Sequence, residues 1–132
     1  MPAEPVPSHG ASGDVPLNWT SSTERTARAL VVRLSGELDY PSRDALEDML
    51  TGALETGPPA LVLDMSGVSF CDSSSLQALL RASTRAAESG VGFALAAAKR
   101  VVTRPIAVLG LDGQLPGYDS VEAAIEASVE AR

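Results

Sequence analysis

Three consecutive serines, Ser73, Ser74 and Ser75, follow Asp72 in the middle of the chain. Asp and Ser are among the residue types that most often cap the first turn of a helix, and Leu76 begins an apolar pattern of helical spacing directly after them. A serine hydroxyl at such a place can carry a phosphoryl group, because the free N–H groups and the dipole of a helix N-terminus stabilise a phosphate. The same residues also suit an ordinary helix cap, and spacing alone favours that simpler interpretation.

A second group of polar residues follows another predicted strand. Gly36, Glu37, Leu38 and Asp39 come after the second strand, and residues 64–75 come after the third. In α/β sheets, functional groups gather beyond the carboxyl ends of the parallel strands. We therefore expect the two segments to form one docking face, although the first is also typical of an ordinary strand-to-helix turn.

Phosphorylation would act on such a face mainly through charge. It adds about −1.5 to −2 charges to a surface, and like charge and bulk expel a docked partner. Asp39 and Asp72 are expected nearby, where they would strengthen the repulsion. The residues therefore allow a binding protein that is switched off by phosphate at a helix start.

The sequence lacks the residue sets of common enzymes. Its only histidine, His9, lies in a Pro- and Gly-rich N-terminal segment, so no Ser/His/Asp triad fits the folded part. No GxxxxGK[ST] loop, GxGxxG loop or metal-ligand cluster occurs. Asp64 ends a strand, as does the phosphate-accepting aspartate of receiver domains. Receiver domains also need acidic residues directly after their first strand to bind magnesium, and here Ser35 and Gly36 separate that strand from Glu37 and Asp39. We expect no catalysis, no cofactor and no metal.

Composition restricts the partners and the compartment. The net charge is −7, and only one of the ten basic residues is a lysine, so no basic stripe exists for nucleic acid or an anionic membrane. Cys71 is the only cysteine, so no intrachain disulfide forms, and we expect a small buried apolar side chain in a reducing compartment. No apolar run approaches the roughly 20 residues that span a bilayer. We expect a soluble, cytoplasmic protein.

Periodicity predicts alternating strands and helices. Residues 1–16 lack apolar periodicity and predict a disordered tail. Turns are predicted at residues 24–28, at Gly36, which should end the second strand, and at residues 64–67. Helices should begin near Pro41, after Asp72, near Lys99 and at Ser120. The predicted strands are residues 17–23, 29–35, 60–63, 92–97 and 115–118.

The resulting order is β-β-α-β-α-β-α-β-α, which is an α/β class. Strands that alternate with helices imply a largely parallel sheet, and the opening hairpin adds one antiparallel edge strand. Residues 17–132 should form one domain.

Four segments resemble one known family. Residues 64–74 (DMSGVSFCDSS) resemble the signature of STAS domains, in particular those of bacterial anti-sigma factor antagonists. Residues 34–39 (LSGELD) are similar to the first motif of that family, and residues 108–112 and 118–124 are similar to its C-terminal motifs. The segments occur in matching order on the predicted elements, and the resemblance covers residues 17–130.

The resemblance implies a regulator of transcription. An unphosphorylated antagonist binds an anti-sigma factor that is itself a serine kinase, and thereby frees a sigma factor. The kinase phosphorylates the antagonist and a serine phosphatase reverses the reaction. Carried over to this chain, the acceptor is Ser74, with Ser73 as the second choice. Ser75 stands where the family usually has glycine.

The implied partner-binding residues come from both loops. They are Gly36, Glu37, Leu38, Asp39, Asp72, Ser73, Ser74, Ser75 and Leu76. An alternative for the same fold is a STAS scaffold of the stressosome type, or a small-ligand or lipid-transport accessory module. The Asp-Ser-Ser motif and the stand-alone length favour the sigma-factor regulator.

Overall fold

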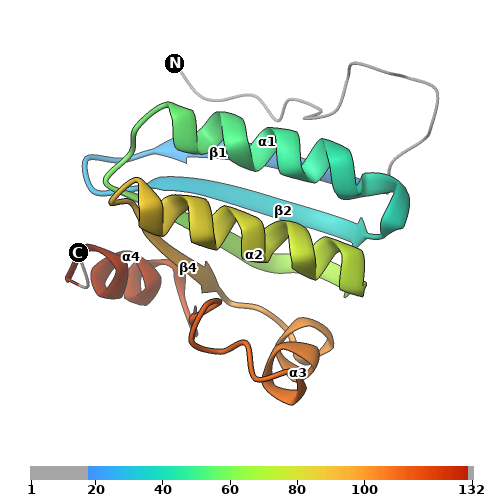
Figure 1. Ribbon diagram of the computed structural model, residues 1–132. Helices are drawn as coiled ribbons and strands as arrows, with labels where there is room; N and C mark the ends of the chain where they lie inside the picture. Colours follow the sequence, from blue (N-terminus) through green and yellow to red (C-terminus); the bar gives the residue numbers. More distant parts are fainter. Residues whose placement is uncertain (1–17, 131–132) are drawn as a thin grey trace.

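In the computed structural model, residues 18–130 are described and form a five-stranded sheet with helices against both of its faces (Figure 1). The predicted order of elements is confirmed. The expected N-terminal tail and His9 lie outside the described residues. The elements are β1 Trp19–Arg25, β2 Leu30–Leu38, a 3-10 helix η1 Tyr40–Ser42, α1 Arg43–Glu55, β3 Ala60–Cys71, α2 Ser73–Glu88, β4 Gly92–Ala96, α3 Arg100–Val108, β5 Gly117–Tyr118 and α4 Val121–Glu130.

The sheet contains both antiparallel and parallel pairs, and its strands are neighbours in the order in which they occur in the chain. The strands lie in the order β1-β2-β3-β4-β5. β1 pairs with β2 in antiparallel fashion, and every later pair is parallel. The expected opening hairpin and parallel sheet are therefore confirmed. Figure 1 shows α1 and α2 side by side along one face of this sheet.

The central strand β3 divides the core into two parts, because successive strand side chains point to opposite faces. Leu61 and Leu63 pack with apolar residues of α1, α2 and α3. Val62 packs on the other side, against Ala124 of α4. All three β3 side chains are fully buried, which confirms a strand covered on both faces. Among residues 18–130, no helix is long and apolar enough to cross a membrane.

The predicted end of the second strand at Gly36 is wrong, because β2 continues to Leu38. Gly36 has a φ of +107°, and a Cβ atom there would lie 2.1 Å from the carbonyl oxygen of Asn18. The same carbonyl accepts a hydrogen bond of 2.9 Å from the N–H of Glu37. Glycine therefore lets the chain just before β1 approach β2 closely, and the strand bends without leaving the sheet.

The predicted turn at residues 64–67 is wrong as well, because β3 continues through these residues. The pairing with β2 is irregular at two places. Met65 and Ser66 together lie opposite Leu34. Ser69 is an extra residue of β3 between the pairs Gly36–Val68 and Glu37–Phe70. Such β-bulges accept turn-forming residues without ending a strand. The Asp-Met-Ser-Gly sequence thus marks a distorted strand.

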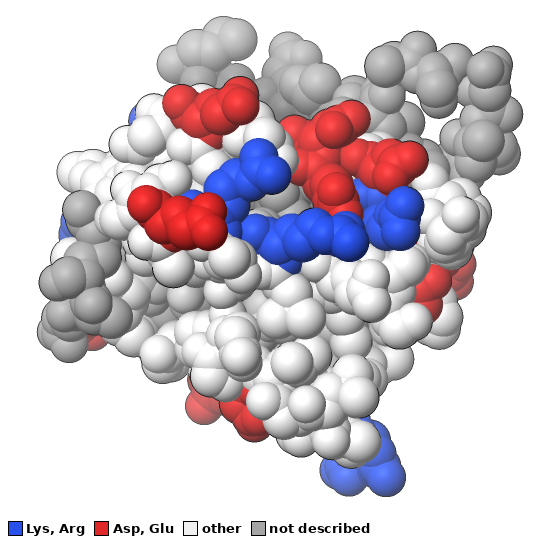
Figure 2. Space-filling view, viewed as in Figure 1, with Lys and Arg blue, Asp and Glu red and all other residues white. Residues whose placement is uncertain are grey.

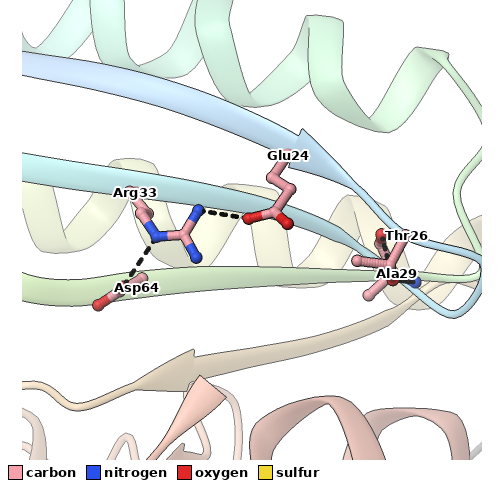
Figure 3. Close-up of polar contacts among 5 residues, drawn as sticks. All are labelled: Glu24, Thr26, Ala29, Arg33 and Asp64. Atoms are coloured by element: carbon pink, nitrogen blue, oxygen red, sulfur yellow. Dashed lines mark hydrogen bonds and ion pairs between the residues drawn. The ribbon is translucent and has the colours of Figure 1, made fainter. Parts of the chain in front are cut away.

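The first turn is shorter than predicted. Glu24 and Arg25 belong to β1, and Glu24 pairs with Arg33 on β2 at 2.8 Å. The turn is closed by the Thr26 hydroxyl, which donates to the carbonyl of Ala29 at 3.1 Å and accepts from its N–H at 3.0 Å (Figure 3). The last strand is also shorter than predicted and comprises only Gly117–Tyr118.

Candidate functional site

The two segments that were expected to form one face are neighbours in the structure. Leu38 at the end of β2 lies opposite Cys71 at the end of β3. The N–H of Asp72 then donates to the carbonyl of Leu38 at 3.0 Å. This bond holds the β2–α1 connection against the first turn of α2, and Figure 1 shows β2 ending and α2 beginning at the same end of the molecule.

Asp72 is the N-cap of α2, as predicted. Its backbone is extended, with φ −87° and ψ 179°, and its carboxylate accepts the N–H of Ser75 at 2.9 Å. The same Oδ1 accepts the hydroxyl of Ser74, also at 2.9 Å. One carboxylate oxygen therefore closes the helix and orients the predicted phosphate acceptor.

Several groups act on the pKa of Asp72. Partial desolvation is the largest single influence and raises the pKa, but hydrogen bonds outweigh it and the net pKa is lowered. The hydrogen bonds from the N–H of Ser75 and the hydroxyl of Ser74 lower it most, and the nearby Ser75 hydroxyl and Tyr40 N–H lower it less. Asp72 is thus a charged carboxylate shared by the start of α2 and by η1.

The three serines differ in accessibility, which the sequence left open. Ser73 is exposed, Ser74 is half-buried and Ser75 is fully buried. The Ser75 hydroxyl lies near the Asp72 carboxylate but has no hydrogen-bond partner among the described residues. The hydroxyls of Ser73 and Ser74 are therefore accessible from the solvent to different degrees, whereas Ser75 faces the core.

The remaining predicted partner-binding residues also differ in exposure. Glu37 is exposed, and Gly36 and Asp39 are half-buried. Leu38 and Leu76 are buried in the main core, so their side chains support the surface from below.

Sequence reasoning missed one residue of this region. Tyr40, the first residue of η1, has 68% of its side chain exposed, next to the loop that was singled out. The guanidinium carbon of Arg43 lies 5.8 Å from the centre of its ring. The available signal was an aromatic residue beside Pro41 in a chain with only 4% aromatic residues.

Cys71 is a small buried side chain, as predicted. Burial, and secondly the negative charge of Asp72, raises the pKa of its thiol to about 12. A thiol with such a pKa remains protonated at neutral pH and is a poor nucleophile. Its position next to Asp72 therefore adds no thiolate chemistry to this region.

Asp64, the other carboxylate at a parallel strand, is engaged in structural contacts. It accepts the N–H of Ser66 at 3.0 Å and lies 3.5 Å from Nε of Arg33 (Figure 3). Arg33 in turn joins Glu24, so the three side chains link β1, β2 and β3. Within the described part of the chain, no group of three or more His, Cys, Asp or Glu residues could hold a metal ion.

Comparison with known proteins identifies the family of this chain. Residues 20–124 match the STAS domain family. RsfB of Mycobacterium tuberculosis, named an anti-sigma-F factor antagonist, is 37% identical over 95 residues, which cover 72% of this chain and 77% of RsfB. The crystal structure of an anti-sigma factor antagonist from Mycobacterium paratuberculosis is similar with a TM-score of 0.74 at 32% identity, and the match covers 86% of this chain and 97% of that one.

A third similarity concerns the fold alone. The unphosphorylated form of the anti-sigma factor antagonist SpoIIAA has a TM-score of 0.65 at 23% identity, over 85% of this chain and 97% of SpoIIAA. The long sequence match, the shared architecture and the Asp-Ser-Ser start of α2 lead to one conclusion: this chain belongs to the STAS domain family.

Proposed function

We propose that this chain is an anti-sigma factor antagonist. In its unphosphorylated form it binds an anti-sigma factor that is also a serine kinase, and phosphorylation of Ser74 releases it. A serine phosphatase restores the binding form. The chain is the substrate of these enzymes and has no catalytic role of its own. It works in the cytoplasm, where sigma factors meet RNA polymerase.

The observation that carries the proposal is the hydroxyl of Ser74 on the N-cap of α2. It lies 2.9 Å from the Asp72 carboxylate, beside the β2–α1 connection. A phosphate in this place adds about two negative charges within a few ångströms of an existing one. A partner that has covered this surface would lose contact through bulk, through charge repulsion and through the cost of burying a charge.

Accessibility supports Ser74 over its neighbours. Ser75 is fully buried, so phosphorylation there would require the first turn of α2 to leave the core. Ser73 is exposed, whereas the Ser74 hydroxyl is held in a defined direction by its hydrogen bond to Asp72. We therefore assign Ser74 as the acceptor and keep Ser73 as the second choice.

The proposal predicts where the phosphate goes. The chain is incubated with ATP and with the anti-sigma factor kinases of its own host, and the products are mapped by mass spectrometry. We expect a single phosphate on Ser74, loss of labelling in Ser74→Ala, and labelling as in the wild type in the matched control Ser73→Ala. Labelling of Ser73 that persists in Ser74→Ala would move the acceptor, and no labelling by any such kinase would remove the phosphorylation step.

Binding is measured separately. By calorimetry, Ser74→Glu should bind the anti-sigma factor at least about tenfold more weakly than the wild type, which corresponds to about 1.4 kcal/mol. Circular dichroism should show that the variant is folded. Equal affinity of the wild type, Ser74→Asp and Ser74→Glu would contradict a charge-based release.

A further inference from the structure

Tyr40 is a large apolar side chain that the fold does not bury. Its exposed fraction is 68%, and Phe70 is the other exposed aromatic residue, at 44%. Phe70 lies on the face of the sheet away from the main core. Cys71 packs into the core under α2, so its strand neighbour Phe70 points to the opposite face of the sheet. Tyr40 instead belongs to η1, which contacts both α1 and α2.

The backbone of Tyr40 is held at the switch. η1 contacts α2, and the N–H of Tyr40 is one of the groups that lower the pKa of Asp72, whose carboxylate accepts the Ser74 hydroxyl. Pro41 follows directly and fixes the start of η1. Arg43 lies over the ring from the first turn of α1. The ring is therefore presented from a constrained backbone, which reduces the entropy lost when a partner binds it.

We propose that Tyr40 is the aromatic anchor of the surface that binds the anti-sigma factor, and that Asp72 couples this anchor to Ser74. The inference rests on the proposed function and adds a residue and a partner chemistry to it. Tyrosine is enriched among the residues that dominate binding energies, because it combines a large apolar ring with a polar end. The matching partner surface is an apolar pocket for a phenol ring, beside the surface that receives Ser74.

The coupling follows from the shared carboxylate. Phosphate on Ser74 removes the hydroxyl proton that is donated to Asp72 and brings a second negative charge to the same oxygen. Asp72 must then change its contacts with the first turn of α2 and with the N–H of Tyr40. The anchor is thereby disturbed together with the switch, and part of the binding lost on phosphorylation is lost through Tyr40.

The test measures affinity for the purified anti-sigma factor by calorimetry. Tyr40→Ala should weaken binding by about 30-fold or more, as for residues that dominate an interface. Tyr40→Phe should keep most of the affinity, because the ring is the larger part of the contact. Val108→Ala, which removes another exposed apolar side chain at the end of α3, is the control, and its affinity should stay within about threefold of the wild type. Thermal unfolding should be similar for all these variants, since both side chains are exposed.

A double-mutant cycle tests the coupling. If Asp72 links the two residues, Ser74→Glu should cause a smaller fold-loss in the Tyr40→Ala background than in the wild type. If the wild type binds and Ser74→Glu does not, but Tyr40→Ala binds within about threefold of the wild type, the anchor is refuted while the proposed function stands. An equally large loss in Val108→Ala also refutes it. If the wild type binds no anti-sigma factor, the proposed function fails, and the inference fails with it.

Discussion

At the scale of single residues, Asp72 combines a structural role with a part in the proposed switch. Its carboxylate closes the first turn of α2 through the N–H of Ser75 and orients the hydroxyl of Ser74. A carboxylate near a helix N-terminus is also favoured by the helix dipole. The residue that prepares the acceptor is therefore one that the fold needs in any case.

Replacing Asp72 tests this double role. Asp72→Ala should lower the free energy of unfolding by about 0.5–2 kcal/mol at pH 7, the usual loss of an N-cap. The folded state lowers the pKa of Asp72 below 3.8, so its ionic contribution is present above the unfolded pKa of about 3.9. That contribution is lost as the pH falls through the lower folded pKa.

The control for this prediction is Asp72→Asn, which keeps a capping oxygen but does not titrate. In urea unfolding at a series of pH values, the advantage of the wild type over Asp72→Asn should shrink below about pH 4. An advantage that grows as the pH falls would show that the pKa is raised by burial instead.

Ser75 gives a second prediction at the residue scale. Its hydroxyl is fully buried and lacks a hydrogen-bond partner among the described residues. Removing an unsatisfied buried hydroxyl should be favourable, so Ser75→Ala should raise the free energy of unfolding by about 1 kcal/mol in urea titrations. Ser75→Gly, which restores the usual residue of the family, should gain less, because glycine costs about 0.5–1 kcal/mol in a helix. A clear loss of stability in Ser75→Ala would mean that the hydroxyl is satisfied.

At the scale of elements, β2 and β3 bring the two functional loops together by staying in the sheet longer than their sequences predict. β2 bends at Gly36, and β3 has two bulges before Cys71. If either strand ended early, the bond from Asp72 to the carbonyl of Leu38 could not form. The irregular ends of these strands therefore position the proposed switch.

The need for glycine at position 36 can be tested with Gly52 as a control. Gly36→Ala places a methyl group 2.1 Å from the Asn18 carbonyl oxygen at a φ of +107°, and it should lower the free energy of unfolding by more than about 1 kcal/mol. Gly52 lies in α1, where a Cβ atom meets nothing within 4 Å, so Gly52→Ala should raise stability by about 0.5–1 kcal/mol. Chemical denaturation distinguishes the two, and equal effects would argue against the close approach at Gly36.

At the scale of the whole molecule, stability and function occupy different regions. Apolar residues of α1, α2 and α3 cover one face of the sheet, and α4 covers part of the other. Figure 2 shows charged side chains gathered where α1 and α2 meet, and Arg81 of α2 pairs there with Glu47 of α1. The surface on the α3 side of α2 is largely uncharged in the same view. A new charge at the start of α2 therefore lies outside both cores, which allows a switch in binding without unfolding.

The sequence by itself determined the order of strands and helices, the parallel sheet with its antiparallel edge, the cap at Asp72 and the family. The elements and the cap depend on side-chain periodicity and capping chemistry within a few residues, and the family on the resemblance of short motifs, all of which are visible within single segments. Only the tertiary structure decided that β2 and β3 continue through Gly36 and residues 64–67, that Ser75 is buried beside a half-buried Ser74, and that Tyr40 lies at the switch. Each of these depends on contacts between segments far apart in the chain, such as Asn18 with Gly36 or Leu38 with Asp72, and local sequence patterns carry no information about them.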